Sequence, residues 1–587
     1  MHQRFRTSWT IWAAGLLLAA ILAALIVYPL GALISQAFDR GGEGPVRRML
    51  DIAGDRSFLL SLRHSVEVAV GSSLLAGAIG LGLAWLTSRT DIPGRRWIEA
   101  GAMVPYLIPP FILAIAWVQL LGPVGYGNRF WMELTGNRDP LIRLYSAGGI
   151  IFVLGVSHAP LVYITLARAL DRYSNVLEEA ARAHGAGPFR TWWSVFLPTV
   201  GPSLAGGTLL ALVAGLADFG VPAILGFSSG YFVLTTLIWE ELNRFGSGDN
   251  LSRAAVLSLY LILLSVVFLW IGQLIQRRWR WSPPPGDAAR IALGRWRGPV
   301  FGLILAWLVL TSVAPLIAVT LTALTPAWGI DPWPSTWTLD NFGEVFDIES
   351  VRRAARNSLT AAAVGATLAS LVGVAVGRVL ARPGRRGRVL LDGLVNAPYA
   401  VPGTVLAIGM ILAYARPLPL LGSPLYNTLG IIIVAYVARY LALAARNAEV
   451  AFLRVDASLE EAARVAGANQ AHVARDVLWP LIFPSLIAGW LLAFQPMLRE
   501  LTLSLLLWSP GNETIGVVVF QLQDNGEVTG AAALAALLLI GIFAVQALTV
   551  WLTARADRAR TASGPTPAAA DAAARSTAGL PGRQAEA

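Results

Sequence analysis

Apolar runs of about 20 residues recur along the whole chain, separated by short polar connections. A helix of that length crosses the hydrocarbon core of a bilayer, and soluble domains seldom contain such runs. Only 14% of the residues are charged, against roughly 25% in soluble proteins. We therefore expect an all-α, polytopic membrane protein. Its twelve expected spans lie near 11–36, 66–87, 100–121, 148–168, 200–226, 253–276, 300–324, 358–380, 392–414, 428–445, 481–508 and 529–553.

The arginines indicate which side of the membrane is cytoplasmic. The chain has no lysine, so arginine supplies the whole basic excess behind the net charge of +10. The arginines mostly flank apolar runs, which is typical of cytoplasmic loops and gives no reason to expect nucleic-acid binding. The connections after the sixth and eighth spans are especially rich, with Arg277, Arg278, Arg280, Arg290, Arg295 and Arg297, and with Arg382, Arg385, Arg386 and Arg388. The positive-inside rule therefore places both termini in the cytoplasm of a multi-pass inner-membrane protein, although the first outer loop also carries five arginines.

The chain also repeats itself. Residues 178–185 (EEAARAHG) return as 460–467 (EEAARVAG), and residues 105–115 align with 398–408. The offset is 282 for the first pair and 293 for the second, so the first half has about eleven extra residues, expected near 122–147. Each half holds six spans, so both halves enter the membrane in the same orientation, as parallel repeats related by an axis along the membrane normal.

The repeats divide the chain into four predicted segments. The first half spans 1–281, with a core repeat over about 55–276, and the second spans 299–559, with a core repeat over about 350–555. Residues 282–298 are a cytoplasmic linker, because three successive prolines cannot continue a helix. Residues 560–587 have few large apolar residues and are expected to form a disordered cytoplasmic tail.

The two repeated polar segments, 175–198 and 457–480, are called the islands. Each carries signals for a helix, a glycine turn and a second helix. Ser458 with Glu461 has capping-box spacing, and Asn175 with Glu178 has the same spacing. The signals for the turn and for the second helix are Gly185 and Gly467, and Pro188 and Asn469.

Paired alanines in each island leave a smooth strip between an acidic residue and an arginine, which another protein surface can approach closely. The alternative is an ordinary capped loop helix, in which alanine only favours helix formation. In both copies a proline, Pro198 or Pro480, follows Glu179 or Glu461 after 19 positions. That identical spacing favours a docking site over an ordinary capped loop helix.

Two acidic residues stand in apolar surroundings at equivalent positions. Asp218 follows Pro198 by 20 residues, and Glu500, beside Arg499, follows Pro480 by 20. Twenty helical residues rise about 30 Å, which places both acids in the middle or outer part of the membrane. Ionisable residues there indicate a translocation pathway or gate, with direct cation ligation as a further alternative. The structural alternatives are that Glu500 pairs with Arg499 or with an outer-loop arginine, and that Asp218 caps the end of a broken helix.

Proline pairs mark a third equivalent place, around Pro109 in the first half and Pro402 in the second. Prolines interrupt helix hydrogen bonding, which a membrane tolerates only where the backbone faces protein or water. Helix kinks are expected at both positions, either lining a pore or serving packing alone.

Residues for catalysis or for resident metals and cofactors are not apparent. There is no cysteine, and the five histidines lack metal-ligand spacing. A phosphate-binding P-loop requires a lysine, so ATP hydrolysis would belong to a partner and the chain is not expected to be an enzyme.

The islands resemble the signature loop of permease subunits of binding-protein-dependent ABC importers of type I. The first copy matches fully, and the second has Trp479 in place of the leucine before the proline. The matching residues are Glu179, Ala180, Ala181, Gly185, Val195, Leu197 and Pro198, and Glu461, Ala462, Ala463, Gly467 and Pro480. The resemblance covers roughly 55–555 and implies two six-helix permease repeats fused in one chain. It also implies two cytoplasmic ATPase subunits, into which the loops dock, and an external solute-binding protein.

Residues 217–223 and 235–239, together with 499–501 and the residues that follow, are similar to fused ferric-iron permeases. Related permeases for thiamine, polyamine, phosphonate or sulfate remain alternatives. A secondary transporter with two parallel six-helix repeats, driven by an ion gradient, is the rival of a different class. Such a transporter has no need of two matched docking loops.

Overall fold

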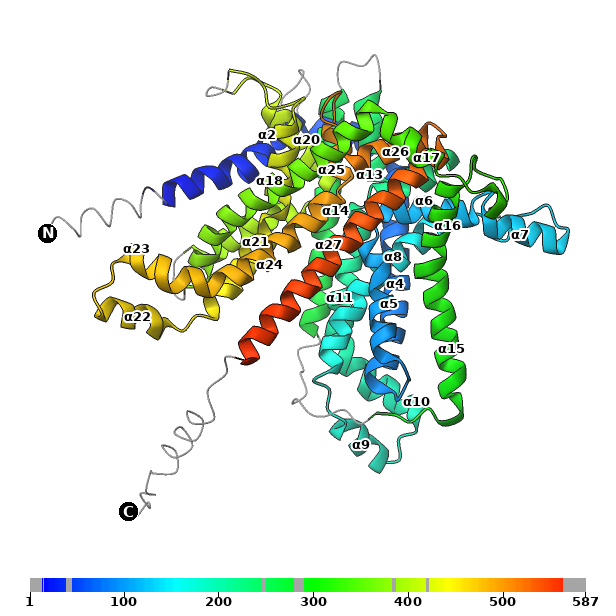
Figure 1. Ribbon diagram of the computed structural model, residues 1–587, viewed down its shortest axis with the longest axis horizontal. Helices are drawn as coiled ribbons and strands as arrows, with labels where there is room; N and C mark the ends of the chain where they lie inside the picture. The colour runs from blue at the N-terminus through cyan, green and yellow to red at the C-terminus, as the bar shows by residue number, and fades with distance from the viewer. Residues whose placement is uncertain are drawn as a thin grey trace.

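The computed structural model describes residues 13, 15–38, 45–244, 250–278, 290–332, 334–382, 387–418 and 422–562. These residues form helices and connecting segments, with one isolated bridge between Thr90 and Ile291 (Figure 1). By length and composition, eleven of the helices could cross a membrane, or up to thirteen if each of two bent pairs counts as one span. The prediction of an all-α polytopic protein with about twelve spans is confirmed.

The elements follow one another in the same order in both halves. The first half contains η1 (Ala23–Val27), α2 (Tyr28–Phe38), α3 (Pro45–Ala53), α4 (Arg56–Arg89), α5 (Arg95–Leu107), α6 (Pro110–Leu121), α7 (Tyr126–Thr135), α8 (Ala147–Leu170), α9 (Val176–Ala183), α10 (Pro188–Thr191), η2 (Trp192–Phe196), α11 (Leu197–Ala217), α12 (Gly220–Gly226), η3 (Phe227–Ser229), α13 (Leu234–Asn243) and α14 (Asn250–Arg278). The second half contains η4 (Gly294–Trp296), α15 (Arg297–Leu308), η5 (Val309–Val313), α16 (Ala314–Leu324), η6 (Pro334–Thr336), α17 (Asp340–Asp347), α18 (Glu349–Leu380), α19 (Arg388–Ala400), α20 (Gly403–Tyr414), α21 (Leu429–Leu453), α22 (Ala457–Val465), α23 (Gln470–His472), η7 (Val473–Leu478), α24 (Trp479–Leu498), α25 (Thr502–Leu507), α26 (Ile515–Asp524) and α27 (Val528–Ala562). Helix α7 has no counterpart among the described residues between α20 and α21, so the extra residues lie where the repeat offsets predict them.

Four π-helical segments show how proline shapes these helices. Each of η1, η2, η5 and η7 ends two residues before a proline, namely Pro29, Pro198, Pro315 and Pro480. A proline lacks the amide hydrogen of a regular helix and its ring clashes with the carbonyl four residues earlier. One wider turn before the proline relieves that clash by shifting the hydrogen-bond register. The prolines that close the two islands therefore fix how each island re-enters its long helix.

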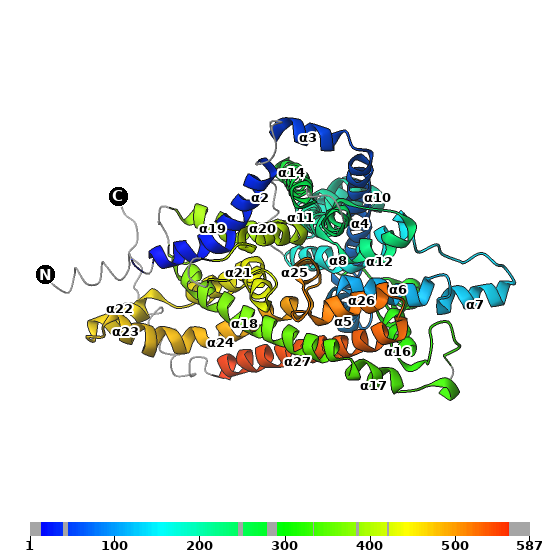
Figure 2. The same cartoon turned by 90° about the horizontal axis from the view of Figure 1, so that it is seen from above.

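The two halves are interlocked, because the first helix of each packs against the other half (Figure 2). Helix α2 lies along α20, and the Tyr414 hydroxyl donates a hydrogen bond of 2.6 Å to the Ala24 carbonyl. Helix α16 lies along α6, and the Tyr126 hydroxyl is 3.1 Å from the Thr322 hydroxyl. Neither half therefore buries all of its own apolar surface alone.

Small residues let the central helices of each half approach closely, as in other membrane bundles. A Cβ atom at Gly80 of α4 would lie 2.7 Å from the Val162 Cβ and 2.9 Å from the Tyr163 amide nitrogen of α8. In the second half a Cβ atom at Gly373 of α18 would lie 2.9 Å from the backbone of Ala444 in α21. The equivalent glycines thus set the same helix spacing in both halves.

We expect Gly80→Ala to destabilise the protein by about 1–3 kcal/mol, because the added methyl group meets backbone atoms that cannot move aside. Thermal unfolding of the purified chain in detergent would measure the loss. Gly82→Ala is the matched control on the same helix, since no atom would lie within 4 Å of its Cβ. Equal melting temperatures for the two variants would contradict the packing described for α4 and α8.

The structure corrects four of the expected spans, of which 100–121 and 392–414 are each divided at a proline, between α5 and α6 and between α19 and α20. Residues 200–226 and 481–508 are not continuous helices, because α11 ends at Ala217 and α24 ends at Leu498. The sequence stays apolar beyond both breaks, so hydropathy did not reveal them. In addition, α15 begins at Arg297, inside the predicted linker, and α27 continues to Ala562, past the predicted start of the tail. Residues 279–289 and 563–587 lie outside the described part of the chain.

Candidate functional site

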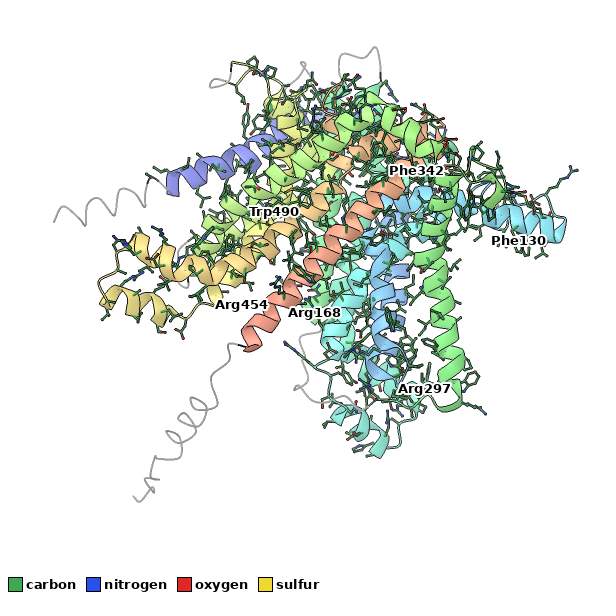
Figure 3. All side chains as sticks on the ribbon, in the orientation of Figure 1. Phe130, Arg168, Arg297, Phe342, Arg454 and Trp490 are labelled. Atoms are coloured by element: carbon green, nitrogen blue, oxygen red, sulfur yellow. The ribbon has the colours of Figure 1, made fainter. Side chains whose placement is uncertain are left out.

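The islands lie at the far ends of the long helices, away from the short helices α12, α13, α25 and α26. Figure 1 shows α9 and α10 below α11, and α22 and α23 at the end of the α21–α24 pair. In Figure 3 the labelled side chains of Arg168, Arg297 and Arg454 also lie toward this side of the molecule. The islands and these arginines therefore share one face, as the arginine pattern predicts.

Each island turns at a glycine with a left-handed backbone. Gly185 has φ of 82° and Gly467 has φ of 90°, values that favour glycine because other residues strain there. The following amides bond back identically: Ala186 to the Ala181 carbonyl at 3.0 Å, and Ala468 to the Ala463 carbonyl at 2.9 Å. These bonds are those of a Schellman turn, so the predicted glycine turns are confirmed.

The predicted capping boxes are wrong in both islands. Helix α22 begins at Asp456, whose carboxylate accepts a 2.9 Å hydrogen bond from the Ser458 amide and thereby replaces Ser458 as the cap. That bond favours the charged carboxylate and lowers the pKa of Asp456. Asn175 precedes α9 without capping it. The starts of the second helices are confirmed, with Pro188 at the first position of α10 and the Asn469 side chain capping α23 at 2.9 Å.

A buried ion pair fixes the first island to α4. The Glu178 carboxylate accepts hydrogen bonds of 2.8 Å from Arg89 and 2.7 Å from the Tyr173 hydroxyl. The Arg89 guanidinium lies 4.5 Å from the centre of the Tyr173 ring and also donates to the Asn175 side chain. Only 2% of the Arg89 side chain and 6% of the Glu178 side chain are exposed. We call the Arg89–Glu178 pair the first clamp.

The second island has an equivalent clamp that is more open to solvent. Arg378, in the last turn of α18, donates to both carboxylate oxygens of Glu460 at 2.7 and 2.8 Å. Its guanidinium lies 5.1 Å from the centre of the Phe452 ring. Here 27% of the arginine side chain and 15% of the glutamate side chain are exposed. The sequence reasoning missed both clamps, although each arginine ends an apolar run.

The next residues of each island helix are more exposed than the clamp glutamates. Glu179 and Ala180, like Glu461 and Ala462, are exposed, whereas Ala181 and Ala463 are partly buried. Exposed large apolar side chains stand beside them: Val176, Phe189 and Trp193 in the first island, and Leu459, Val465 and Trp479 in the second. The two glutamates of each island therefore divide their roles, one anchoring the helix and the next lying free on its surface. Exposed acids, alanines and aromatic groups make a surface suited to a protein partner.

Asp218 and Glu500 both lie at helix breaks and cap the short helix that follows. The Asp218 carboxylate accepts a 2.9 Å hydrogen bond from the Val221 amide at the start of α12. The Glu500 carboxylate accepts a 3.0 Å bond from the Leu503 amide at the start of α25, and a further one from the Tyr440 hydroxyl. The capping alternative is thus confirmed for Asp218.

Arg499 does not pair with Glu500, so that alternative is wrong. Its Nη1 donates instead to the Tyr106 carbonyl of the first half at 2.6 Å, and the guanidinium lies 5.1 Å from the Tyr106 ring centre. Pro109 and Pro402 mark complete breaks rather than kinks, because α6 and α20 begin directly after them. Helices α19 and α20 meet at an angle of 104°. Among the described residues, no group of three or more histidine, aspartate or glutamate side chains could hold a metal ion.

Comparison with known proteins gives matches along most of the chain. The family model described as "Binding-protein-dependent transport system inner membrane component" matches residues 76–281 and 369–558. A ferric transport system permease protein of Actinobacillus pleuropneumoniae is 24% identical over 92% of this chain and 78% of its own length. A putrescine transport system permease protein of Escherichia coli is 29% identical over 42% of this chain and 88% of its own length. A solved bacterial ABC transporter for alginate import covers 44% of this chain and 96% of its own at 15% identity, with a TM-score of 0.37.

Proposed function

The chain belongs to the family of binding-protein-dependent transport system inner membrane components, and from that premise we propose that it carries ferric iron into the cell, driven by two ATPase subunits docked on its islands. It is a multi-pass inner-membrane permease of an ABC importer, with both permease repeats in one polypeptide. Its relatives are transport permeases rather than enzymes. In the proposed complex an external binding protein delivers the substrate, and ATP hydrolysis belongs to the partners.

The form of the islands supports docking. Each presents an exposed acid, an exposed alanine and large apolar side chains on a short helix held by a clamp. Because one such surface occurs in each half, two identical ATPase subunits could bind in equivalent ways. The proposed orientation puts the islands, both termini, the linker 282–298 and the tail 560–587 in the cytoplasm, where ATP is available.

The choice of substrate depends on one observation. The ferric permease aligns with 92% of this chain, and therefore with both halves, whereas the putrescine permease aligns with 42%. Thiamine, polyamine, phosphonate and sulfate remain the alternatives from the same class of permease. Ferric iron is the substrate that a fused two-repeat relative supports.

An uptake assay tests the proposal. In cells without other iron importers, the chain, co-expressed with an ATPase and a ferric-iron-binding protein of this class of importer, should raise uptake of radiolabelled ferric iron by about tenfold or more. Removal of the ATPase should abolish this uptake, and labelled putrescine and sulfate should not enter faster than in control cells. Uptake of putrescine or sulfate instead of iron would refute the substrate. Iron uptake that persists without the ATPase would refute the ATP-driven mechanism in favour of an ion-gradient transporter.

A further inference from the structure

Two arginines lie at the helix breaks, among the membrane-spanning helices, without acidic partners. They are Arg439 of α21 and Arg499, which follows α24. Placing an arginine at the centre of a membrane helix costs about 2.5–3.5 kcal/mol even on the most favourable scale, so such residues generally serve a pathway. Within the described part of the chain, the hydrogen bonds of both guanidinium groups go only to backbone carbonyl oxygens.

The two arginines occupy related places. Arg439 Nη1 donates to the Val401 carbonyl at 2.9 Å, just before Pro402. Arg499 Nη1 donates to the Tyr106 carbonyl at 2.6 Å, three residues before Pro109. The last carbonyls of a helix have no partner within that helix, and a proline cannot supply one. The arginines therefore donate hydrogen bonds to the carbonyl groups that lack a helical partner at the two breaks.

These bonds leave most N–H donors of each guanidinium group available for another hydrogen-bond acceptor. A guanidinium has five N–H donors, and the bonds to carbonyls use only Nη1 of each arginine. Carbonyl oxygens are neutral, so the two positive charges are not compensated by them. Both side chains are partly exposed, and Arg499 of the second half meets Tyr106 of the first at the interface between the halves.

The neighbouring acids are engaged elsewhere. Asp218 and Glu500 each accept a backbone amide from their own short helix, and Glu500 also binds the Tyr440 hydroxyl. Neither acid forms an ion pair with Arg439 or Arg499 within the described residues. The two carboxylates thus bind backbone amides at the starts of short helices, whereas the two guanidinium groups use only part of their N–H donors. The net charge of these four groups is zero.

Two tyrosines complete the group. Tyr106 and Tyr399 are equivalent in the repeat, and 51% of Tyr399 is exposed. Arg499 lies against the Tyr106 ring, and Arg439 donates to the Val401 carbonyl, two residues beyond Tyr399. Each helix break therefore combines a tyrosine, one from each half, with an arginine of the second half.

We propose that Arg439, Arg499, Tyr106 and Tyr399 form a binding site for an oxyanion group, carboxylate or phosphate-like, in the transport pathway. A planar guanidinium binds such groups through two parallel hydrogen bonds, and a phenol hydroxyl can donate a third. The guanidinium groups themselves offer no ligand atom to a bare trivalent cation, because all their polar groups are N–H donors. This inference rests on the proposed importer function and refines its substrate, since the ferric ion then crosses together with an anionic chelator. A free oxyanion as the substrate would support the site but overturn the choice of iron.

Substitutions in the complete transporter test the site. Arg439→Gln and Arg499→Gln should each lower uptake of ferric citrate by about tenfold, since each removes a charge-assisted contact. Arg499→Lys retains a donor for the Tyr106 carbonyl but loses the planar fork, so its uptake should also fall while the amount of folded protein stays unchanged. Tyr399→Phe removes only a hydroxyl from an exposed ring and should reduce uptake without affecting folding. Arg138→Gln, at an exposed arginine before α8, is the matched control and should transport normally.

Double labelling distinguishes the two sources of the anion. Entry of iron-55 and carbon-14 citrate in a constant ratio would identify the chelator as the anion. Entry of labelled sulfate or phosphate, sensitive to the same substitutions, would identify a free oxyanion. Iron that enters without any labelled anion, at wild-type rate in both glutamine variants, would overturn the site while leaving the importer function intact. No uptake of any probe by the wild-type complex would instead refute the proposed function itself.

Discussion

Replacing Gly185 and Gly467 together with valine is expected to abolish binding of the ATPase and to stop transport. Both glycines have φ near 80–90°, where a residue with a Cβ atom costs about 1–2 kcal/mol. The turn can escape that strain only by changing its backbone, which would reorient the island helix against α10 or α23. Each substitution should lower the docked population about tenfold, and the pair more, because 1.4 kcal/mol corresponds to a factor of ten. Co-purification of the ATPase and iron uptake would measure the effect.

The same turn supplies the control for this experiment. Gly187, two residues further on, has φ of −69° and no atom within 4 Å of its hypothetical Cβ. Gly187→Val should therefore keep the turn and retain both ATPase binding and uptake. If the double variant of Gly185 and Gly467 still binds the ATPase and transports iron normally, the islands are not the docking sites.

Breaking the first clamp should have a large effect on stability. In Arg89→Gln the carboxylate of Glu178 stays buried and keeps only the exposed Arg182, 3.1 Å away, as a cation. Loss of one partner from a buried ion pair costs up to about 3–5 kcal/mol. The equivalent change Arg378→Gln should cost less, because water reaches the second clamp more easily. Thermal unfolding in detergent measures stability, and proteolysis with trypsin at Arg182 measures release of the α9 island.

A double replacement separates the effect of breaking the ion pair from a general loss of packing around α4. Arg89→Met combined with Glu178→Met removes both charges, so it should be less destabilising than Arg89→Gln alone. The predicted order of stability loss is Arg89→Gln, then the double variant, then Arg378→Gln. If Arg89→Gln and Arg378→Gln lose equal stability, the difference in burial between the two clamps has no energetic consequence.

Hydropathy and repetition predicted most of the architecture. The spans followed from the length of the apolar runs, and the equivalence of the halves followed from two short repeats. The breaks at Asp218 and Glu500 could not be read from hydropathy, because both sides of each break are apolar. Each break arises because the carboxylate binds a backbone amide at the start of the following helix. This hydrogen bond competes with continuation of the preceding helix.

Within the islands, the sequence located the glycine turns but not the roles of the two adjacent glutamates. Glu178 and Glu179 differ only by one step of about 100° around the helix, and only the packed structure determines which one faces α4. The partner of Arg499 was equally hidden. Its carbonyl acceptor at Tyr106 is 393 residues away and in the other half, so no local pattern indicates it.

The crossed packing of the first helices has a consequence for synthesis of the chain. The Ala24 carbonyl is bonded to Tyr414, 390 residues later, and α2 lies along α20. At about 5–20 residues per second, α2 leaves the ribosome about 20–80 s before its partner helix exists. During that interval lipid or an assembly factor must cover the surface that α20 later occupies. Fusion of the two halves guarantees that the partner arrives in the same membrane and in equal number, so the waiting helix does not depend on meeting a separately made subunit.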